Sequence, residues 1–339
     1  MKKFAMGNEI LAQAAFDAGA KIMFGYPITP TTEVLSTWIK LAEKSGRKYL
    51  QTEDEMAAGF GVCGAVLAGV PAFTATAGPG TILMQDPLVM AEALRLPFVV
   101  FIGQRGGPST GQVVYSQQEV NLAIYGGNNE GLRIVYSSSG LQDLYTYGIK
   151  AFNVAWKYRF PTILLYDGYQ GKMKGVVEIP DKKLKEVKTE PILTKNMRNT
   201  YNLEEELAEE VLKAKDEFEK NSKELIEYEE FQTEKAEVLI FAHGIVSSAV
   251  KEAVKSLRKK KIPIGLFRPI TLSPFPIKKA ALVLQKAKQI IVFESSLGQF
   301  SRIIKEKIYW VNIPLVEVFK PGVGFTPEEI EKTVLSLLT

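Results

Sequence analysis

Residues 72–102 read AFTATAGPGTILMQDPLVMAEALRLPFVVFI, which is a strand, a glycine-rich turn, a helix and a second strand. The second strand, Pro97–Ile102, is continuously apolar rather than alternating. Continuous apolarity is typical of strands buried on both faces, and a helix between two such strands favours parallel pairing. The stretch therefore predicts an α/β fold built on a parallel sheet.

The same alternation extends in both directions along the chain. Before and after this stretch we expect strands at 21–26, 48–52, 133–136 and 162–166, and helices at 30–44, 55–67 and 141–158. Residues 169–200 are poor in pattern, and the Glu- and Lys-rich segment 203–230 predicts a solvated amphipathic helix. A second α/β unit follows, with strands at 238–241, 264–267 and 289–293 and helices at 247–259 and 278–286. We expect a first domain over 1–200, a charged helical linker over 201–232 and a second domain over 233–339.

Composition excludes several classes of function. Lys and Arg number 42 against 38 Asp and Glu, so no nucleic-acid footprint is expected. The apolar runs fall short of the ~20 residues of a membrane span. A single cysteine, Cys63, and a single histidine, His243, exclude disulfides within the chain, a cysteine-ligated metal cluster made by this chain alone, and histidine-based triads. We expect a cytoplasmic protein whose acid–base chemistry depends on carboxylates or a cofactor.

Four loops are expected at the carboxyl ends of the strands, where parallel α/β sheets bind ligands. The first, Tyr26-Pro-Ile-Thr-Pro30, has two prolines that fix the backbone around Ile28 and Thr29 and present one hydroxyl rigidly. A proline at a helix start with a threonine cap explains the same residues.

The second loop, QTEDEMAAG at 51–59, opens a helix with three acids, which the helix dipole alone would favour. The helix itself consists largely of Ala and Gly, so another backbone or a flat ligand could approach it closely. A carboxyl group at the rim of such an apolar surface has a raised pKa, which suits it to share a proton with a ring nitrogen.

The third loop, TATAGPG at 74–80, is similar to a phosphate-cradling turn but lacks the lysine of a P-loop. In the fourth, QRGGPSTG at 104–111, Arg105 lies among Gly, Ser and Thr at a strand end. There a guanidinium can bind a carboxylate with two hydrogen bonds. Pairing of Arg105 with a neighbouring acid is the alternative.

Taken together, these four motifs resemble the alpha subunit of 2-oxoacid:ferredoxin oxidoreductases, thiamine-diphosphate enzymes that oxidise 2-oxoacids to acyl-CoA. The resemblance extends to Arg268-Pro269, Pro274-Phe-Pro276 and Glu294-Ser-Ser-Leu-Gly-Gln299. It implies a pyrimidine-binding thiamine-type domain with a parallel sheet, followed by a transketolase C-terminal-like α/β domain.

The resemblance also implies roles for individual residues. Glu55 is expected to hydrogen-bond the aminopyrimidine ring of the cofactor, with Glu53 and Asp54 as the alternatives. Thr29 and Arg105 are expected beside the carbonyl and carboxylate of the substrate, so the expected catalytic residues are Glu55, Thr29 and Arg105. The expected cofactor-binding residues are Pro27, Ile28, Thr29, Glu55 and Gly78, and the expected substrate-binding residues are Thr29, Arg105, Ser109 and Thr110.

Parts of the expected machinery are missing from the sequence. Thiamine enzymes bind Mg²⁺ and the diphosphate through a Gly-Asp-Gly…Asn motif, and the nearest approach here is Tyr166-Asp-Gly168, which we interpret as a turn that ends a strand. The resemblance therefore implies a beta subunit that carries the Mg²⁺ and diphosphate site and a [4Fe-4S] cluster, with no metal on this chain. It implies further partners: gamma and delta subunits, ferredoxin, CoA and a 2-oxoacid.

The expected reaction is oxidative decarboxylation of a 2-oxoacid with CoA to acyl-CoA, CO₂ and reduced ferredoxin, or the reverse carboxylation. 2-Oxoglutarate is the leading substrate, with pyruvate and 2-oxoisovalerate as alternatives. Residues 112–118 lack Lys and Arg, which weakens the case for a dicarboxylate. The alternative from another class of function is a non-catalytic subunit of the same fold that only binds a partner. The presence of Glu55, Thr29 and Arg105 argues against it. We expect packing roles for His243 and Cys63.

Overall fold

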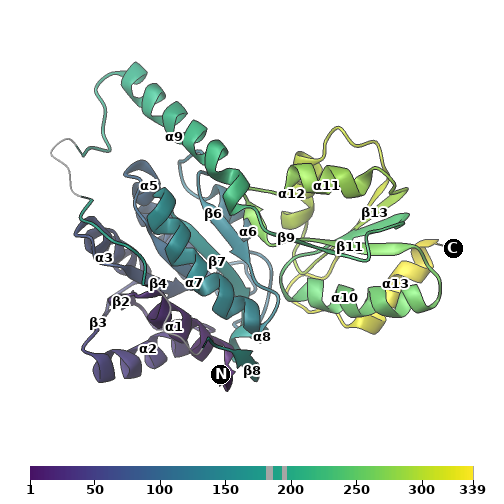
Figure 1. Cartoon of the computed structure of the whole chain (residues 1–339), viewed down its shortest axis with the longest axis horizontal. Coiled ribbons are helices and arrows are strands. Elements are labelled where there is room, and N and C mark those ends of the chain that lie inside the picture. The colour runs from purple at the N-terminus through teal and green to yellow at the C-terminus, as the bar shows by residue number, and fades with distance from the viewer. Residues whose placement is uncertain (181–185, 193–196, 339) are drawn as a thin grey trace.

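The computed structural model describes residues 1–180, 186–192 and 197–338. Figure 1 shows two sheets side by side, each flanked by helices, with the second sheet drawn in green and yellow. The predicted alternation of strands and helices is confirmed in both halves of the chain.

The first sheet has seven strands in the order β12-β6-β7-β5-β4-β2-β3. Every pairing is parallel except that of β12 with β6. In register, β5 runs beside β7 from Val99 opposite Thr162 to Gln104 opposite Asp167. Its strands are β2 (Ile22–Gly25), β3 (Lys48–Gln51), β4 (Ala72–Thr76), β5 (Val99–Gln104), β6 (Ile134–Ser137), β7 (Thr162–Asp167) and β12 (Thr271–Ser273).

Both faces of this sheet are covered, as the continuous apolar strands require. On β5, Val99 and Phe101 pack in a core with α1, α2 and α7, whereas Val100 and Ile102 pack on the opposite side with α3 and α5. The helices of this half are α1 (Gly7–Ala18), α2 (Thr32–Ser45), α3 (Glu55–Leu67), α4 (Pro79–Leu83), α5 (Gln85–Ala93), α6 (Val120–Tyr125), α7 (Leu141–Tyr158) and α8 (Gly168–Lys172).

The second sheet has five strands in the order β14-β13-β10-β11-β9, parallel except for β9. Its strands are β9 (Tyr228–Phe231), β10 (Val238–Phe241), β11 (Ile264–Pro269), β13 (Gln289–Glu294) and β14 (Leu315–Phe319). The helices around it are α10 (Gly244–Lys259), α11 (Ile277–Leu284), α12 (Gln299–Lys307) and α13 (Pro327–Leu338).

Three features differ from what the sequence pattern predicts. The segment 201–232 contains the helix α9 (Glu204–Leu225), but it also contains β9, so it is not helical throughout. Part of the segment 169–200 forms β8 (Lys174–Glu178), which pairs antiparallel with β1 (Lys2–Met6). Strand β12 lies beyond residue 233 yet pairs with β6 of the first sheet. The domain boundaries themselves remain a prediction.

A buried arginine connects the two halves. Arg268, at the end of β11, forms ion pairs with Asp143 of α7 and with Glu229 of β9, and donates a hydrogen bond of 3.2 Å to the Ser137 carbonyl. Because the guanidinium is only 5% exposed, removing either carboxylate would leave a buried charge partly unpaired. Arg268 therefore fixes the place of the second sheet against β6 and α7.

Two glycines of α3 serve the packing of this chain, so of the two expected uses of its small residues, close approach by the chain itself or by a flat ligand, the structure shows the first at these positions. A Cβ at Gly59 would lie 2.3 Å from Pro87, and one at Gly61 would lie 2.4 Å from the Phe24 ring. Of these glycines, only Gly64 would place a Cβ in open space. Two of the three glycines of α3 therefore admit side chains of α5 and β2.

This contrast gives a matched pair of variants. Gly59→Ala should destabilise the chain by about 1–3 kcal/mol, because the added methyl overlaps the rigid Pro87 ring. Gly64→Ala should leave the free energy of unfolding unchanged or raise it by up to about 1 kcal/mol, because alanine favours the helix and meets no atom. Urea unfolding of both variants measures this difference, and equal effects would contradict the packing described for α3.

Candidate active site

The four loops that the sequence singles out lie next to one another. Strands β3, β2, β4 and β5 are consecutive neighbours in the first sheet and run in the same direction. Their carboxyl ends therefore meet at one edge, which is where open parallel sheets bind ligands.

Glu55 is the buried member of the three acids. It is the first residue of α3 and is 5% exposed, whereas Glu53 is exposed and Asp54 caps the helix by accepting a 2.7 Å hydrogen bond from the Ala57 amide. The carboxyl group of Glu55 lies against Gly80, where a Cβ would be 2.3 Å from Oε1. Only glycine at position 80 leaves room for this acid.

The environment of Glu55 favours the protonated form. Burial raises the pKa of Glu55, and the negative charge of Asp54 raises it further, whereas the charge of Arg105 acts in the opposite direction. Oε1 has no hydrogen-bond partner among the described residues. Glu55 therefore combines a raised pKa with an unused oxygen, which suits it to exchange a proton with a ligand.

Arg105 follows β5 and is 6% exposed. Its Nη1 donates a 2.8 Å hydrogen bond to the Thr29 carbonyl, and its Nε has no partner in the described part of the chain. The guanidinium packs on Gly78, where a Cβ would be 2.4 Å from Nε. Gly78 also has a φ of +53°, which favours glycine there. Among the described residues no acid forms an ion pair with Arg105, whose hydrogen-bond partner is the Thr29 carbonyl, although the charges of Glu55 and Glu119 act on it over a longer distance.

The loop 26–31 holds Thr29 between Pro27, which is exposed, and the start of α2. The Ile28 carbonyl accepts hydrogen bonds from the amide of Thr31 at 2.8 Å and from its hydroxyl at 2.9 Å. Thr31, and not Thr29, therefore closes the turn. No described residue hydrogen-bonds the Thr29 hydroxyl, so it remains available at the exposed face of the loop.

Ser109 and Thr110 are not brought into the same cluster. Both are exposed on the loop after β5, and no hydrogen bond connects either hydroxyl to another described residue.

The loop itself is held near the sheet at other points. A Cβ at Gly168 would be 1.7 Å from the Val114 carbonyl oxygen, which explains the glycine of Tyr166-Asp-Gly168. Asp167 ends β7 and caps α8 by accepting a 3.0 Å hydrogen bond from the Gln170 amide.

Sequence reasoning missed Glu119, which is 3% exposed and lies next to the same cluster. Its Oε1 accepts hydrogen bonds from the Gly78 amide and, at 3.3 Å, from the Thr81 hydroxyl. The available signal was its place directly before the apolar helix α6. This position does not distinguish a site residue from a structural one, because the helix dipole alone favours an acid at the start of a helix.

The two residues expected to have packing roles are both buried. His243 hydrogen-bonds Ser137 Oγ through Nδ1 at 3.0 Å and packs against the Phe300 ring. Burial, with the nearby Arg268 charge, lowers the pKa of His243 to about 3, so the ring is neutral. Burial likewise raises the pKa of the Cys63 thiol to about 12, which leaves it unreactive at neutral pH.

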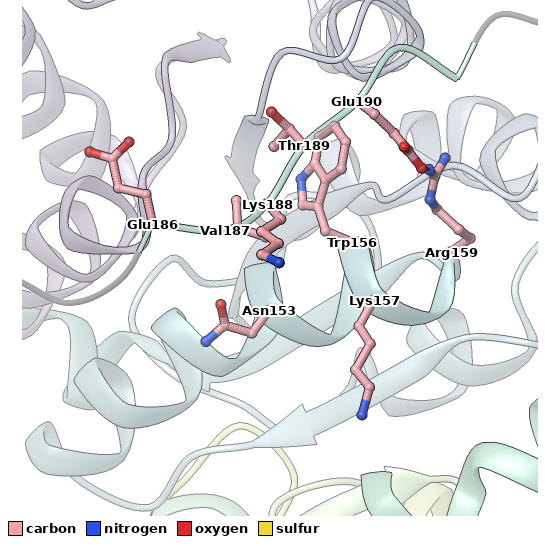
Figure 2. A pocket seen from close by; sticks show the side chains of 9 residues that line it. All are labelled: Asn153, Trp156, Lys157, Arg159, Glu186, Val187, Lys188, Thr189 and Glu190. Carbon is pink, nitrogen blue, oxygen red and sulfur yellow. Dashed lines mark hydrogen bonds and ion pairs between the residues drawn. The ribbon is translucent and has the colours of Figure 1, made fainter.

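A separate hollow lies away from these loops. Figure 2 shows it between α7 and the segment 186–190. Its volume is about 750 Å³. Its lining mixes both charges, and Arg159 and Glu190 form an ion pair of 3.0 Å within it. None of the four candidate loops contributes to it, so it is not part of the candidate active site.

The described residues contain neither a cluster of metal-binding side chains nor a helix that could span a membrane. No group of three or more His, Cys, Asp or Glu side chains there could hold a metal ion. In the same part of the chain, every helix is too short or too polar to cross a bilayer.

Two family models match the chain. The model described as "Pyruvate flavodoxin/ferredoxin oxidoreductase, thiamine diP-bdg" matches residues 13–239. The model described as "Pyruvate:ferredoxin oxidoreductase core domain II" matches residues 236–330.

Known proteins agree with this assignment. The chain is 33% identical to the 2-oxoglutarate synthase subunit KorA of Methanocaldococcus jannaschii, over 98% of this chain and 99% of that protein. It is also 33% identical to the ketoisovalerate oxidoreductase subunit VorB of Methanothermobacter marburgensis, over 88% of each chain. Among solved structures it resembles the 2-oxoglutarate:ferredoxin oxidoreductase of Magnetococcus marinus, with 2-oxoglutarate, coenzyme A and succinyl-CoA bound, at a TM-score of 0.90 and 27% identity. The match covers all of this chain and 65% of the solved chain.

These matches confirm the thiamine-diphosphate-binding fold that the sequence predicts. The chain therefore belongs to the 2-oxoacid:ferredoxin oxidoreductase family, in which it is an alpha-type subunit.

Proposed function

We propose that this chain is the alpha subunit of a cytoplasmic 2-oxoglutarate:ferredoxin oxidoreductase. The reaction is oxidative decarboxylation of 2-oxoglutarate with CoA to acyl-CoA, CO₂ and reduced ferredoxin, or the reverse carboxylation. The relatives named 2-oxoglutarate synthase support this substrate, and so does the solved structure that holds 2-oxoglutarate and CoA. The single structural observation that carries the proposal is the buried Glu55 carboxyl with its unpaired Oε1.

The donor set fits the pyrimidine side of thiamine diphosphate. Glu55 supplies an unpaired carboxyl oxygen beside Gly80, as a partner for a ring nitrogen requires. When bound, thiamine diphosphate supplies the carbon nucleophile that attacks the 2-oxo group. In the proposal, Pro27, Ile28, Thr29 and Gly78 would contact the cofactor beside Glu55.

This chain's residues perform three tasks in the proposal. Glu55 holds a proton at Oε1 and shares it with the ring, because burial favours its neutral form. Arg105 binds the substrate carboxylate through its guanidinium, while Nη1 keeps its hydrogen bond to the Thr29 carbonyl. The Thr29 hydroxyl hydrogen-bonds the substrate carbonyl. Ser109 and Thr110 would orient the carboxylate only if their loop closes over the site.

The remaining parts are assigned to partners. An iron–sulfur cluster requires several cysteine thiolates, and the sequence contains one cysteine, Cys63. The Gly-Asp-Gly motif for Mg²⁺ and diphosphate is also missing from the sequence. We therefore assign both the metal–diphosphate site and the [4Fe-4S] cluster to a beta-type subunit, with gamma and delta subunits and ferredoxin as further partners.

The substrate is tested on the complex assembled with its beta-type subunit. CoA-dependent reduction of a viologen dye is measured with 2-oxoglutarate, pyruvate and 2-oxoisovalerate. We expect the highest kcat/KM with 2-oxoglutarate. A preference for 2-oxoisovalerate would contradict this substrate, and it would agree with the VorB relative and with the absence of Lys and Arg from 112–118.

The role of Glu55 is tested by Glu55→Gln, with Glu53→Gln as the matched control. An amide in place of the Glu55 carboxyl cannot give up a proton, so turnover should fall by roughly 10²–10⁴-fold. Glu53 is exposed, and its variant should retain nearly full activity. Equal losses in the two variants, or a larger loss at Glu53, would remove Glu55 from the site.

Stability gives a second readout for Glu55. An acid whose pKa is raised by folding stays protonated in the native state after the unfolded chain has lost its proton. The contribution of Glu55 to the free energy of unfolding should therefore decline as pH rises from the ordinary glutamate pKa to the raised one. Glu55→Gln should lack this decline, and an identical pH dependence in the two proteins would contradict the buried acid.

A further inference from the structure

Glu119 is a buried acid that the proposed chemistry does not use. It lies between the loop after β5 and α6, and the Gly78 amide and the Thr81 hydroxyl both donate to its Oε1. Its Oε2 has no hydrogen-bond partner among the described residues. The carboxyl group thus holds both ends of the turn that begins α4.

Gly78 connects Glu119 to Arg105. The Gly78 amide donates to Glu119, while the place of a Gly78 side chain is filled by the Arg105 guanidinium, since a Cβ there would be 2.4 Å from Nε. A displacement of this turn would therefore displace Arg105. The positive charge of Arg105 in turn favours the ionised form of Glu119.

The second half of the molecule holds the segment that carries Glu119. Residues 115–121 are hydrogen-bonded to it on both sides of Glu119. These bonds include Tyr115 hydroxyl to Ser295 Oγ at 2.8 Å, Gln117 Nε2 to the His243 carbonyl at 2.9 Å, the Ser295 amide to Gln117 Oε1 at 2.8 Å, Gln299 Nε2 to the Gln118 carbonyl at 2.7 Å, and the Asn121 amide to Gln299 Oε1 at 3.0 Å.

We propose that Glu119 is a positioning residue. The hydrogen bonds from the second half to residues 115–121 fix Glu119, Glu119 fixes the turn 78–81, and this turn fixes Arg105. The segments around His243 and Ser295 take no part in the proposed chemistry. Their hydrogen bonds to residues 115–121 give them a structural role in it. The proposal rests on the proposed function, because Arg105 is there the group that binds the 2-oxoacid carboxylate.

The ionisation of Glu119 gives this role a measurable signature. Burial raises the pKa of Glu119 to about 8, against the hydrogen bonds from Gly78 and Thr81 and the charge of Arg105. Other ionisable groups face this region from neighbouring elements: Tyr166 on β7, whose pKa is raised well above its usual range, and Glu55 on α3 across Gly80. Above about pH 8 a new negative charge therefore develops near Arg105, and it weakens the attraction of Arg105 for a carboxylate.

The test compares Glu119→Gln and Glu119→Ala in the assembled complex. Hydrogen exchange is followed in the peptide that covers 78–81, and KM and kcat for 2-oxoglutarate are measured from about pH 7 to about pH 9, on either side of the raised pKa of Glu119. Glu119→Ala removes the acceptor of the Gly78 amide, so exchange there should accelerate by about tenfold and KM should rise by about tenfold, with a smaller change in kcat. Glu119→Gln keeps an acceptor oxygen for the Gly78 amide. At about pH 7 its exchange rate at 78–81 and its KM should therefore be close to those of the wild type.

The pH profile separates positioning from a merely structural role. The wild-type KM should rise above about pH 8, whereas KM of Glu119→Gln should not rise there. Leu284→Ala, which deletes buried apolar volume from α11, is the control for general destabilisation and should leave exchange at 78–81 unchanged.

Three results would overturn the proposal: unchanged exchange and KM in Glu119→Ala, equal impairment in both Glu119 variants, or the same rise of KM at high pH in wild type and Glu119→Gln. If Glu119→Ala does not fold, the pH dependence of KM in Glu119→Gln, compared with that of the wild type, tests the proposal alone. A complex that oxidises none of the 2-oxoacids would defeat the proposed function, while exchange at 78–81 would still decide whether Glu119 holds the turn.

Discussion

The candidate active site depends on the close approach of two charged side chains to the turn 78–80. Glu55 lies against Gly80 and Arg105 lies against Gly78, and a methyl group at either glycine would overlap them at 2.3–2.4 Å. An acid and a guanidinium from different elements are thereby buried side by side, each with one unpaired polar atom. Burial of such groups costs free energy unless they are hydrogen-bonded or paired, so the rest of the fold must offset that cost and hold both groups in place. Buried groups with perturbed ionisation are concentrated at functional sites.

That frame extends through both halves of the chain. Arg268 ties β11 to α7 and to the Ser137 carbonyl, β12 adds an antiparallel edge to the first sheet, and residues 115–121 are hydrogen-bonded to the second half. The second half therefore does more than follow the first along the chain. It fixes the loop that carries Glu119, and Glu119 fixes the turn on which Arg105 lies.

Much of the fold could be predicted from the sequence, because strands buried on both faces have continuous apolar runs. The helices 55–67 and 141–158 and the strand 238–241 have the predicted bounds. Strand β12 could not be predicted, since three residues carry no periodic signal and its pairing depends on tertiary packing. Glu55 and Arg105 were predicted as site residues from their motifs, and their roles remain proposals. Glu119 was missed because its partner, the Gly78 amide, lies 41 residues away in the sequence.

In the proposed enzyme this chain supplies Glu55, the acid for the pyrimidine ring, and a partner subunit completes the active site. Calorimetric titration of thiamine diphosphate with Mg²⁺ into the isolated chain, the isolated beta-type subunit and their complex tests this division. We expect tight binding by the complex and binding at least about a hundredfold weaker by this chain alone, because the proposal assigns the metal and diphosphate contacts to the partner. Equally tight binding by the isolated chain would contradict it.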